Sequence, residues 1–167
     1  MTYFKLEHGE AFTAAIAGLQ RQFRAIQRNA TDNQGDITRD EFSTNIHGAI
    51  AEATVAKALG LYCNMSSMDR ALPDVGLNIE VRSSPNPKAS MPIRPRDKDD
   101  AKYYFVVGVY PNTKIVGWKW GRDCKKDSYW VERDKHGNKL EKPYWAVPQS
   151  ELNFELIEVT NETLLAV

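Results

Sequence analysis

The spacing of apolar residues changes once along this chain, near Leu61, and that change limits the folds open to it. Before Leu61, apolar residues recur every three or four positions, which predicts two helices over residues 10–28 and 38–59. After it, apolar residues form short alternating or continuous blocks bounded by turn residues, which predicts strands. Helices followed by hairpin-linked strands favour a mixed α/β (α+β) fold, with a central mixed β-sheet flanked by helices.

The helix and strand boundaries follow from local sequence. Thr38-Arg-Asp-Glu41 has the form of a capping box that opens the second helix, and Gly60 is suited to end it. Residues 84–100, rich in proline and charge, predict a long loop. The apolar positions of the first helix are Phe12, Ala15, Ile16, Leu19, Phe23 and Ile26. The predicted strands are residues 78–83, 102–110 and 114–120, a hairpin over 128–147 that turns near His136, and a last strand at 154–159.

Length and composition bound the protein class. The 167 residues predict a single domain over 1–167, with helices within 9–60 and the sheet and hairpins within 74–160. Formal net charge is zero, which argues against coating nucleic acid by bulk charge but leaves room for a local basic groove. The sequence shows no signal peptide and no apolar run of membrane-spanning length, so we expect a soluble cytoplasmic protein without membrane contact.

The segment from Asp74 to Arg82 is the best candidate for chemistry. Residues two apart on a strand share a face, so Glu80 and Arg82 should lie on one side and Ile79 and Val81 on the other. A turn after Asp74 could fold its carboxylate back beside Glu80. Two carboxylates and a cation at one place can hold Mg²⁺ and a phosphate.

Glu52 adds a third carboxylate. It lies on an apolar stripe of the second predicted helix, where an unpaired charge would be costly. A metal, a base or another partner must compensate it. The alternative without function is a buried salt bridge to Arg82 or another basic residue. For Asp74 and Glu80 the corresponding alternative is a turn acid and an exposed strand acid.

In the order Glu52, then Pro73-Asp74, then Glu80-Val-Arg82, the chain resembles the PD-(D/E)XK nuclease superfamily, in the manner of a small phage-type member. The resemblance implies a restriction-endonuclease-like core and Mg²⁺-dependent (Mn²⁺ possible) hydrolysis of nucleic acid, with a DNA endonuclease as the expected activity. It implies that Glu52, Asp74 and Glu80 bind the metal. It also implies that Arg82 contacts the phosphate.

Arg82 departs from that pattern, because the superfamily usually has lysine there. Arginine stays protonated and cannot act as a general base, although it can clamp a phosphate. The alternatives are a catalytically inactive nucleic-acid-binding protein on the same fold and a protein-interaction module such as an inhibitor or accessory subunit. A homodimer or a protein partner is also possible. Further candidate nucleic-acid contacts are Arg94, Arg96 and Lys98, whereas His47 is expected to be structural.

Overall fold

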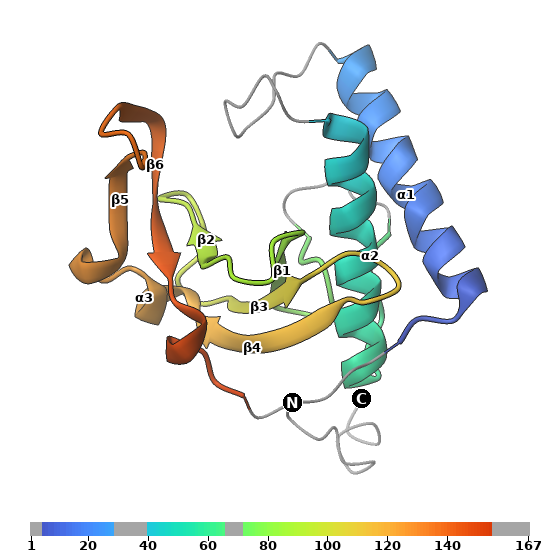
Figure 1. The fold of residues 1–167 in the computed structure, drawn as a ribbon. Helices are drawn as coiled ribbons and strands as arrows, with labels where there is room; N and C mark the ends of the chain where they lie inside the picture. The colour runs from blue at the N-terminus through green and yellow to red at the C-terminus, as the bar shows by residue number, and fades with distance from the viewer. Residues whose placement is uncertain (1–4, 29–39, 66–71, 155–167) are drawn as a thin grey trace.

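The computed structural model describes residues 5–28, 40–65 and 72–154, and it has the mixed α/β class that the sequence predicts. Two long helices form one layer, a three-stranded sheet forms the middle, and a second three-stranded sheet forms the third layer (Figure 1). No helix within these residues is both long enough and apolar enough to cross a membrane.

Helix α1 (His8–Gln27) confirms the first predicted helix, but its large apolar residues are not the ones that pack. Its buried positions carry small or polar side chains: Ala11, Ala14, Ala17, Gly18 and Gln22. A Cβ atom added to Gly18 would lie 2.5 Å from the Cα atom of Ile46. The two helices therefore touch backbone to backbone, and this leaves no room for a larger side chain at the contact.

Helix α2 (Glu41–Leu59) lies between α1 and the middle sheet (Figure 1), and its central turns are buried. Asp40 caps its N-terminus by accepting a hydrogen bond from the Phe42 amide at 3.0 Å. The predicted capping box began at Thr38, which lies outside the described residues. Gly60 ends the helix in the left-handed conformation, at φ 64°, as the sequence predicts.

The middle sheet consists of β1 (Ile79–Ser84), β3 (Lys102–Val107) and β4 (Lys114–Trp120), in the order β1-β3-β4. β1 runs parallel to β3, and β3 runs antiparallel to β4. Ile79 and Val81 are buried with α2 in one core, so Glu80 and Arg82 share the opposite face, as predicted. The strand predicted over 102–110 ends at Val107, because Gly108 turns the chain at φ 85°.

The second sheet corrects the prediction of one long loop over residues 84–100. That segment contains a short strand, β2 (Met91–Ile93), whose Met91 and Ile93 side chains are fully buried. Pro92 fits because β2 is at the edge of its sheet, where a missing amide donor costs least. The predicted hairpin over 128–147 is confirmed as β5 (Trp130–Arg133) and β6 (Lys139–Val147), which give the sheet order β2-β6-β5.

A second core between the two sheets contains Tyr103, Phe105, Val147 and Leu152. Within the described residues, the two long helices therefore cover one face of the middle sheet and the second sheet covers the other. A short helix α3 (Gly121–Cys124) and 3-10 turns at Asp127–Tyr129 and Gln149–Glu151 complete the described chain. The last predicted strand lies, apart from Phe154, outside the described residues.

Candidate metal and phosphate site

The carboxylate of Asp74 lies against the open edge of β1. Its Oδ2 atom accepts a hydrogen bond from the Val81 amide at 2.8 Å. Glu80 is the residue before Val81, so the structure brings Asp74 back beside β1, where the sequence suggested it could fold. The bond also occupies an amide at the free edge of the strand, which fixes the position of Asp74.

Glu80 is a partly buried carboxylate with incomplete compensation. Its ion pair with Lys98 is long, 3.8 Å between Oε1 and Nζ, and its side chain is 17% exposed. Burial, and then the negative charge of Asp74, raise the pKa of Glu80 to about 7. Electrostatic repulsion between these two acids is the condition that a bound cation would relieve.

Glu52 has a partner that sequence reasoning missed. Arg21 of α1 contacts both of its carboxylate oxygens, with Nη1 donating to Oε1 at 2.6 Å. Burial raises the pKa of Glu52 to about 7, while the Arg21 hydrogen bond opposes that rise and the charge of Asp74 adds to it. The structure thus shows the alternative left open by the sequence, a buried salt bridge to a basic residue.

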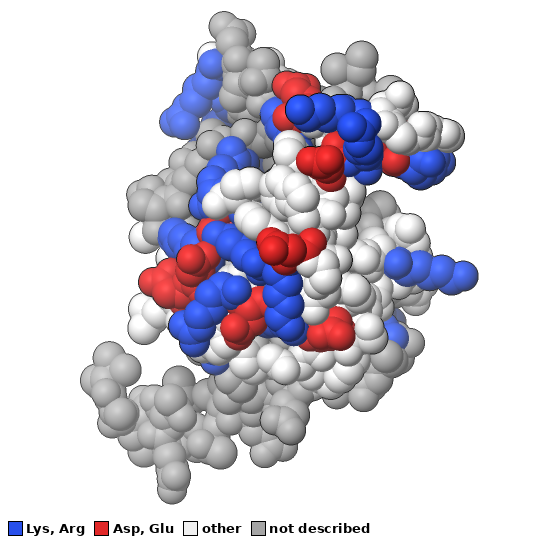
Figure 2. All heavy atoms as spheres, turned by 90° about the vertical axis from the view of Figure 1, so that its left-hand side faces the viewer, with Lys and Arg blue, Asp and Glu red and all other residues white. Residues whose placement is uncertain are grey.

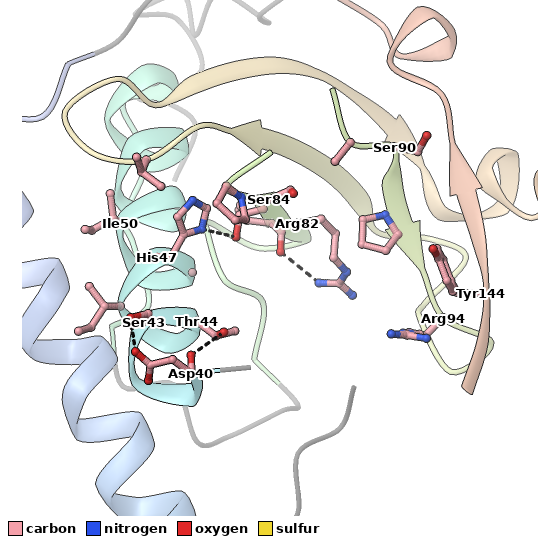
Figure 3. A pocket seen from close by; sticks show the side chains of 18 of the residues that line it. Asp40, Ser43, Thr44, His47, Ile50, Arg82, Ser84, Ser90, Arg94 and Tyr144 are labelled. Carbon is pink, nitrogen blue, oxygen red and sulfur yellow. Dashed lines mark hydrogen bonds between the residues drawn. The ribbon is translucent and has the colours of Figure 1, made fainter. Parts of the chain in front are cut away.

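Arg82 contacts other groups than the three acids. Its Nη2 atom lies 2.9 Å from the Asp97 carboxylate, and its guanidinium lies over the Tyr103 ring at 4.9 Å from the centroid. Stacking and ion pairing together fix the plane of the guanidinium. Figure 3 shows the side chain extending from β1 toward Arg94.

The three acids share an electrostatic environment without forming a closed metal cage. Asp74 raises the pKa of both Glu52 and Glu80. Within residues 5–28, 40–65 and 72–154, however, no group of three or more His, Cys, Asp or Glu side chains could hold a metal ion. Glu52 stays bound to Arg21, so the acids able to offer oxygens together are Asp74 and Glu80.

Beside the acids lies a pocket of about 860 Å³ between the N-terminal half of α2, the end of β1 and the second sheet. Arg82, Arg94 and Arg96 line it, and Lys98 does not. Figure 3 shows Arg82 entering from β1 and Arg94 from the chain just after β2, with Asp40 at the far end near the start of α2. Small polar lining comes from Ser43, Thr44, Ser83, Ser84 and Ser90.

Arg94 is held rigidly at this pocket. Its Nη1 atom donates to the Lys142 carbonyl at 2.6 Å, and its guanidinium lies over the Tyr144 ring at 5.0 Å. Burial lowers the pKa of Arg94, and the positive charges of Arg96 and Arg82 lower it further. Arg82 and Arg96 therefore both lie within electrostatic reach of Arg94, and the Asp97 carboxylate lies beside Arg82 and Arg94.

His47 joins three segments at the pocket wall. Its Nε2 atom lies 2.6 Å from the Gly108 carbonyl, and its Nδ1 atom lies 3.1 Å from the Ser83 hydroxyl. A neutral imidazole satisfies both contacts, with Nε2–H donating to the carbonyl and Nδ1 accepting from the serine. These contacts tie α2 to β1 and to the turn after β3, in line with the structural role expected for His47.

The pocket and the acid pair are local features on a surface of mixed charge. On the face shown in Figure 2, basic and acidic side chains lie interspersed, with no single broad basic area in that view. Comparison of the chain with protein-family models, with characterised proteins and with solved structures gives no match.

Proposed function

We propose that this protein hydrolyses phosphodiester bonds of nucleic acid, with DNA as the expected substrate, using a divalent cation at Asp74 and Glu80. The observation that supports it best is that two sites of opposite charge lie next to each other along β1. An undercompensated acid pair lies at one side, and an arginine-lined pocket lies at the other. Glu80 belongs to the acid pair and Arg82 lines the pocket. The two residues lie two positions apart on one face of the strand.

The donor chemistry fits Mg²⁺, with Mn²⁺ as a substitute. Magnesium is bound in many phosphoryl-transfer sites by one or two carboxylates, with water and substrate oxygens completing its shell. Asp74 and Glu80 supply two such carboxylates, and their mutual repulsion favours a cation between them. When bound, such an ion polarises the phosphate and lowers the pKa of its water.

The basic residues would bind the substrate phosphates. Arg82 is oriented by Asp97 and Tyr103, so it can direct two N–H donors at a phosphate oxygen without a large loss of side-chain entropy. Lys98 is the ammonium group beside Glu80 and would neutralise charge nearest the acid pair. Glu52, held by Arg21, would stabilise the position of the helix rather than donate to the ion.

One observation favours a second candidate, a nucleic-acid-binding protein that does not cleave. Both oxygens of Glu52 are engaged by Arg21, and Arg82 is engaged by Asp97, so two of the four expected catalytic residues are already paired. Such a protein would keep the arginine-lined pocket. It would bind nucleic acid in a salt-dependent way without turnover.

The first test is calorimetric titration of Mn²⁺ into the purified protein and into Asp74→Asn. Asparagine keeps an oxygen to accept the Val81 amide while removing the charge, so the fold should survive. We expect saturable binding to the native protein and loss of binding in the variant. Glu132→Gln, an exposed acid on β5, is the matched control and should bind as the native protein does.

A cleavage assay then separates the two candidates. Labelled single-stranded DNA, duplex DNA and RNA are incubated with Mg²⁺ or Mn²⁺ and with each variant. Cleavage that Asp74→Asn abolishes and Glu132→Gln retains supports hydrolysis at this site. Salt-sensitive binding without cleavage supports the second candidate, and cleavage that persists in Asp74→Asn from a clean preparation rejects the assignment.

A further inference from the structure

Helix α1 presents a row of large apolar side chains to solvent: Phe12, Ile16, Leu19, Phe23 and Ile26, here called the α1 apolar row. Leu19 is partly buried. The other four side chains are exposed, Phe12 by 62%, Ile16 by 40%, Phe23 by 57% and Ile26 by 52%. Phe42 at the start of α2 adjoins the row, with its ring 5.6 Å from that of Phe23 in an edge-to-face contact. Isolated exposed apolar residues are common, but a continuous row along a helix indicates an interface.

Within the described residues, α1 packs on its own chain mainly through another face, although Phe23 contacts Phe42 and Leu19 is half-buried. That face carries the small residues around Gly18, about a third of a turn away on the helix surface. Arg21, which binds Glu52, lies on the flank opposite the row. The row thus faces away from the candidate site.

The spacing of the row identifies the kind of partner it fits. Its members are separated by four, three, four and three residues, which is the spacing of a coiled-coil seam. A seam of this kind packs side chains into the spaces of another helix with the same spacing. α1 has 20 residues and is about 30 Å long, so the seam extends along most of the helix.

The dipole of α1 selects the orientation. The charged residues at its two ends, Glu7, Glu10, Arg24 and Arg28, lie on the side of Arg21, away from the row. Glu10 pairs with Lys57 of its own chain at 2.7 Å. In a parallel pair, the two helix dipoles point the same way and repel each other. In an antiparallel pair, the N-terminal end of one helix dipole lies beside the C-terminal end of the other, and the two dipoles attract.

We propose that α1 pairs antiparallel with α1 of a second copy of this chain, around a two-fold axis at Leu19. Phe12 then opposes Ile26 of the second copy, and Ile16 opposes Phe23, in the self-complementary way that a two-fold interface requires. With the exposures above and Phe42 at the side, the pair buries on the order of 1,000 Å², the lower size of a specific interface. The pairing is independent of the proposed catalytic activity.

Sedimentation velocity and light scattering of the full chain over a range of concentrations test the pairing. We expect a mass of twice 18.9 kDa that falls toward one chain on dilution. Ile16→Glu and Phe23→Glu should each give the single-chain mass at every concentration, with an unchanged circular dichroism spectrum. Gln20→Glu puts the same charge on an exposed position outside the row and should remain dimeric.

Two results would overturn the proposal. One is a single-chain mass for the native protein, which would mean that the row is covered within one chain or by another protein. The other is a dimer that Ile16→Glu and Phe23→Glu leave intact. If a glutamate variant fails to fold, Ile26→Gln, a milder change at the end of the row, replaces it in the same measurement.

Cysteine crosslinking tests the orientation. A mixture of Phe12→Cys and Ile26→Cys proteins should form a mixed disulfide more readily than either variant forms one with itself. Efficient crosslinking of Phe12→Cys with itself would instead indicate a parallel pair and would overturn the antiparallel arrangement. The native protein is the background control, since Cys124 is buried and Cys63 is half-buried.

Discussion

Arg21 and Glu52 join the two long helices through a two-point ion pair, in which both terminal nitrogens of the guanidinium contact the two carboxylate oxygens. The side chains are 12% and 8% exposed. Within the described residues, the Nε atom of Arg21 is buried without a hydrogen-bond partner. The terminal nitrogens of Arg21 are therefore paired while its Nε atom is not, so the net contribution of the ion pair to stability should be small.

Removing one partner should cost more than removing both. Arg21→Met leaves Glu52 buried without a cation and should lower the free energy of unfolding by about 3 kcal/mol. Arg21→Met combined with Glu52→Leu should recover most of that loss, because neither charge is then buried. Urea denaturation of the single and double variants measures the difference. A double variant as unstable as Arg21→Met would show that the pair itself, and not the orphaned charge, stabilises the helices.

Gly18 should tolerate no side chain at all. A Cβ atom there would lie 2.5 Å from the Ile46 Cα atom and 2.6 Å from the Asn45 carbonyl oxygen, and both are backbone atoms that cannot turn aside. We expect Gly18→Ala to lower the free energy of unfolding by about 1–3 kcal/mol through overpacking. Gly48→Ala is the matched control, since nothing lies within 4 Å of its Cβ position. That control should be neutral or stabilise α2 by up to about 1 kcal/mol, as thermal unfolding would show.

The same contact explains how sequence reasoning succeeded on α1 and where it stopped. The three-and-four spacing of large apolar residues identifies the helix correctly. It does not identify the packed face, because the partner helix approaches closest where side chains are smallest. The signal was present in Ala14, Gly18 and Gln22 at four-residue intervals, a small and polar stripe that hydrophobicity alone ranks low.

Glu80 should make stability depend on pH. Its pKa is raised from 4.5 to about 7 in the folded protein by burial and by Asp74. Between these pH values the folded state binds more protons than the unfolded state, so the free energy of unfolding should fall as pH rises from about 4.5 to 7. Urea denaturation in metal-free buffer across this range measures the slope.

Glu80→Gln should make that fall shallower, because the amide does not titrate. The slope that remains comes from Glu52, whose pKa is also raised to about 7. Glu132→Gln, which removes an exposed carboxylate, should leave the pH dependence unchanged. A free energy of unfolding that rises with pH across this range in the native protein would contradict the raised pKa.

The acidic residues show what else a single sequence hides. Strand alternation places Glu80 and Arg82 on one face correctly, and the turn after Asp74 brings it back to β1. The partners come from distant segments: Arg21 from α1 and Asp97 from the loop after β2. The sequence pattern of a helix or strand predicts the face on which each side chain lies. These ion pairs depend instead on how elements far apart in the chain pack together.

Asp97 should weaken anion binding at the pocket. It is the carboxylate that faces Arg82 at 2.9 Å and accepts from the Arg94 amide at 2.8 Å. Asp97→Asn keeps an acceptor for that amide and removes the negative charge beside Arg82 and Arg94. We expect tighter binding of a short fluorescent oligonucleotide in metal-free buffer and a larger loss of affinity with added salt. Unchanged affinity would mean that the phosphates bind elsewhere.

Arg82→Lys tests whether the arginine is a replacement for lysine or a residue with its own geometry. Lysine would lose the planar fork that pairs with Asp97 and stacks on Tyr103, so it cannot hold the same direction into the pocket. If Arg82 contacts the phosphate, the exchange should lower kcat/KM for nucleic-acid cleavage by about ten- to a hundredfold while costing only about 1 kcal/mol of stability. Steady-state cleavage kinetics and urea denaturation separate the two effects, with Lys88→Arg in the loop before β2 as the control exchange. Higher activity in Arg82→Lys would show that the position works through its charge alone and that the stacked guanidinium restrains the reaction.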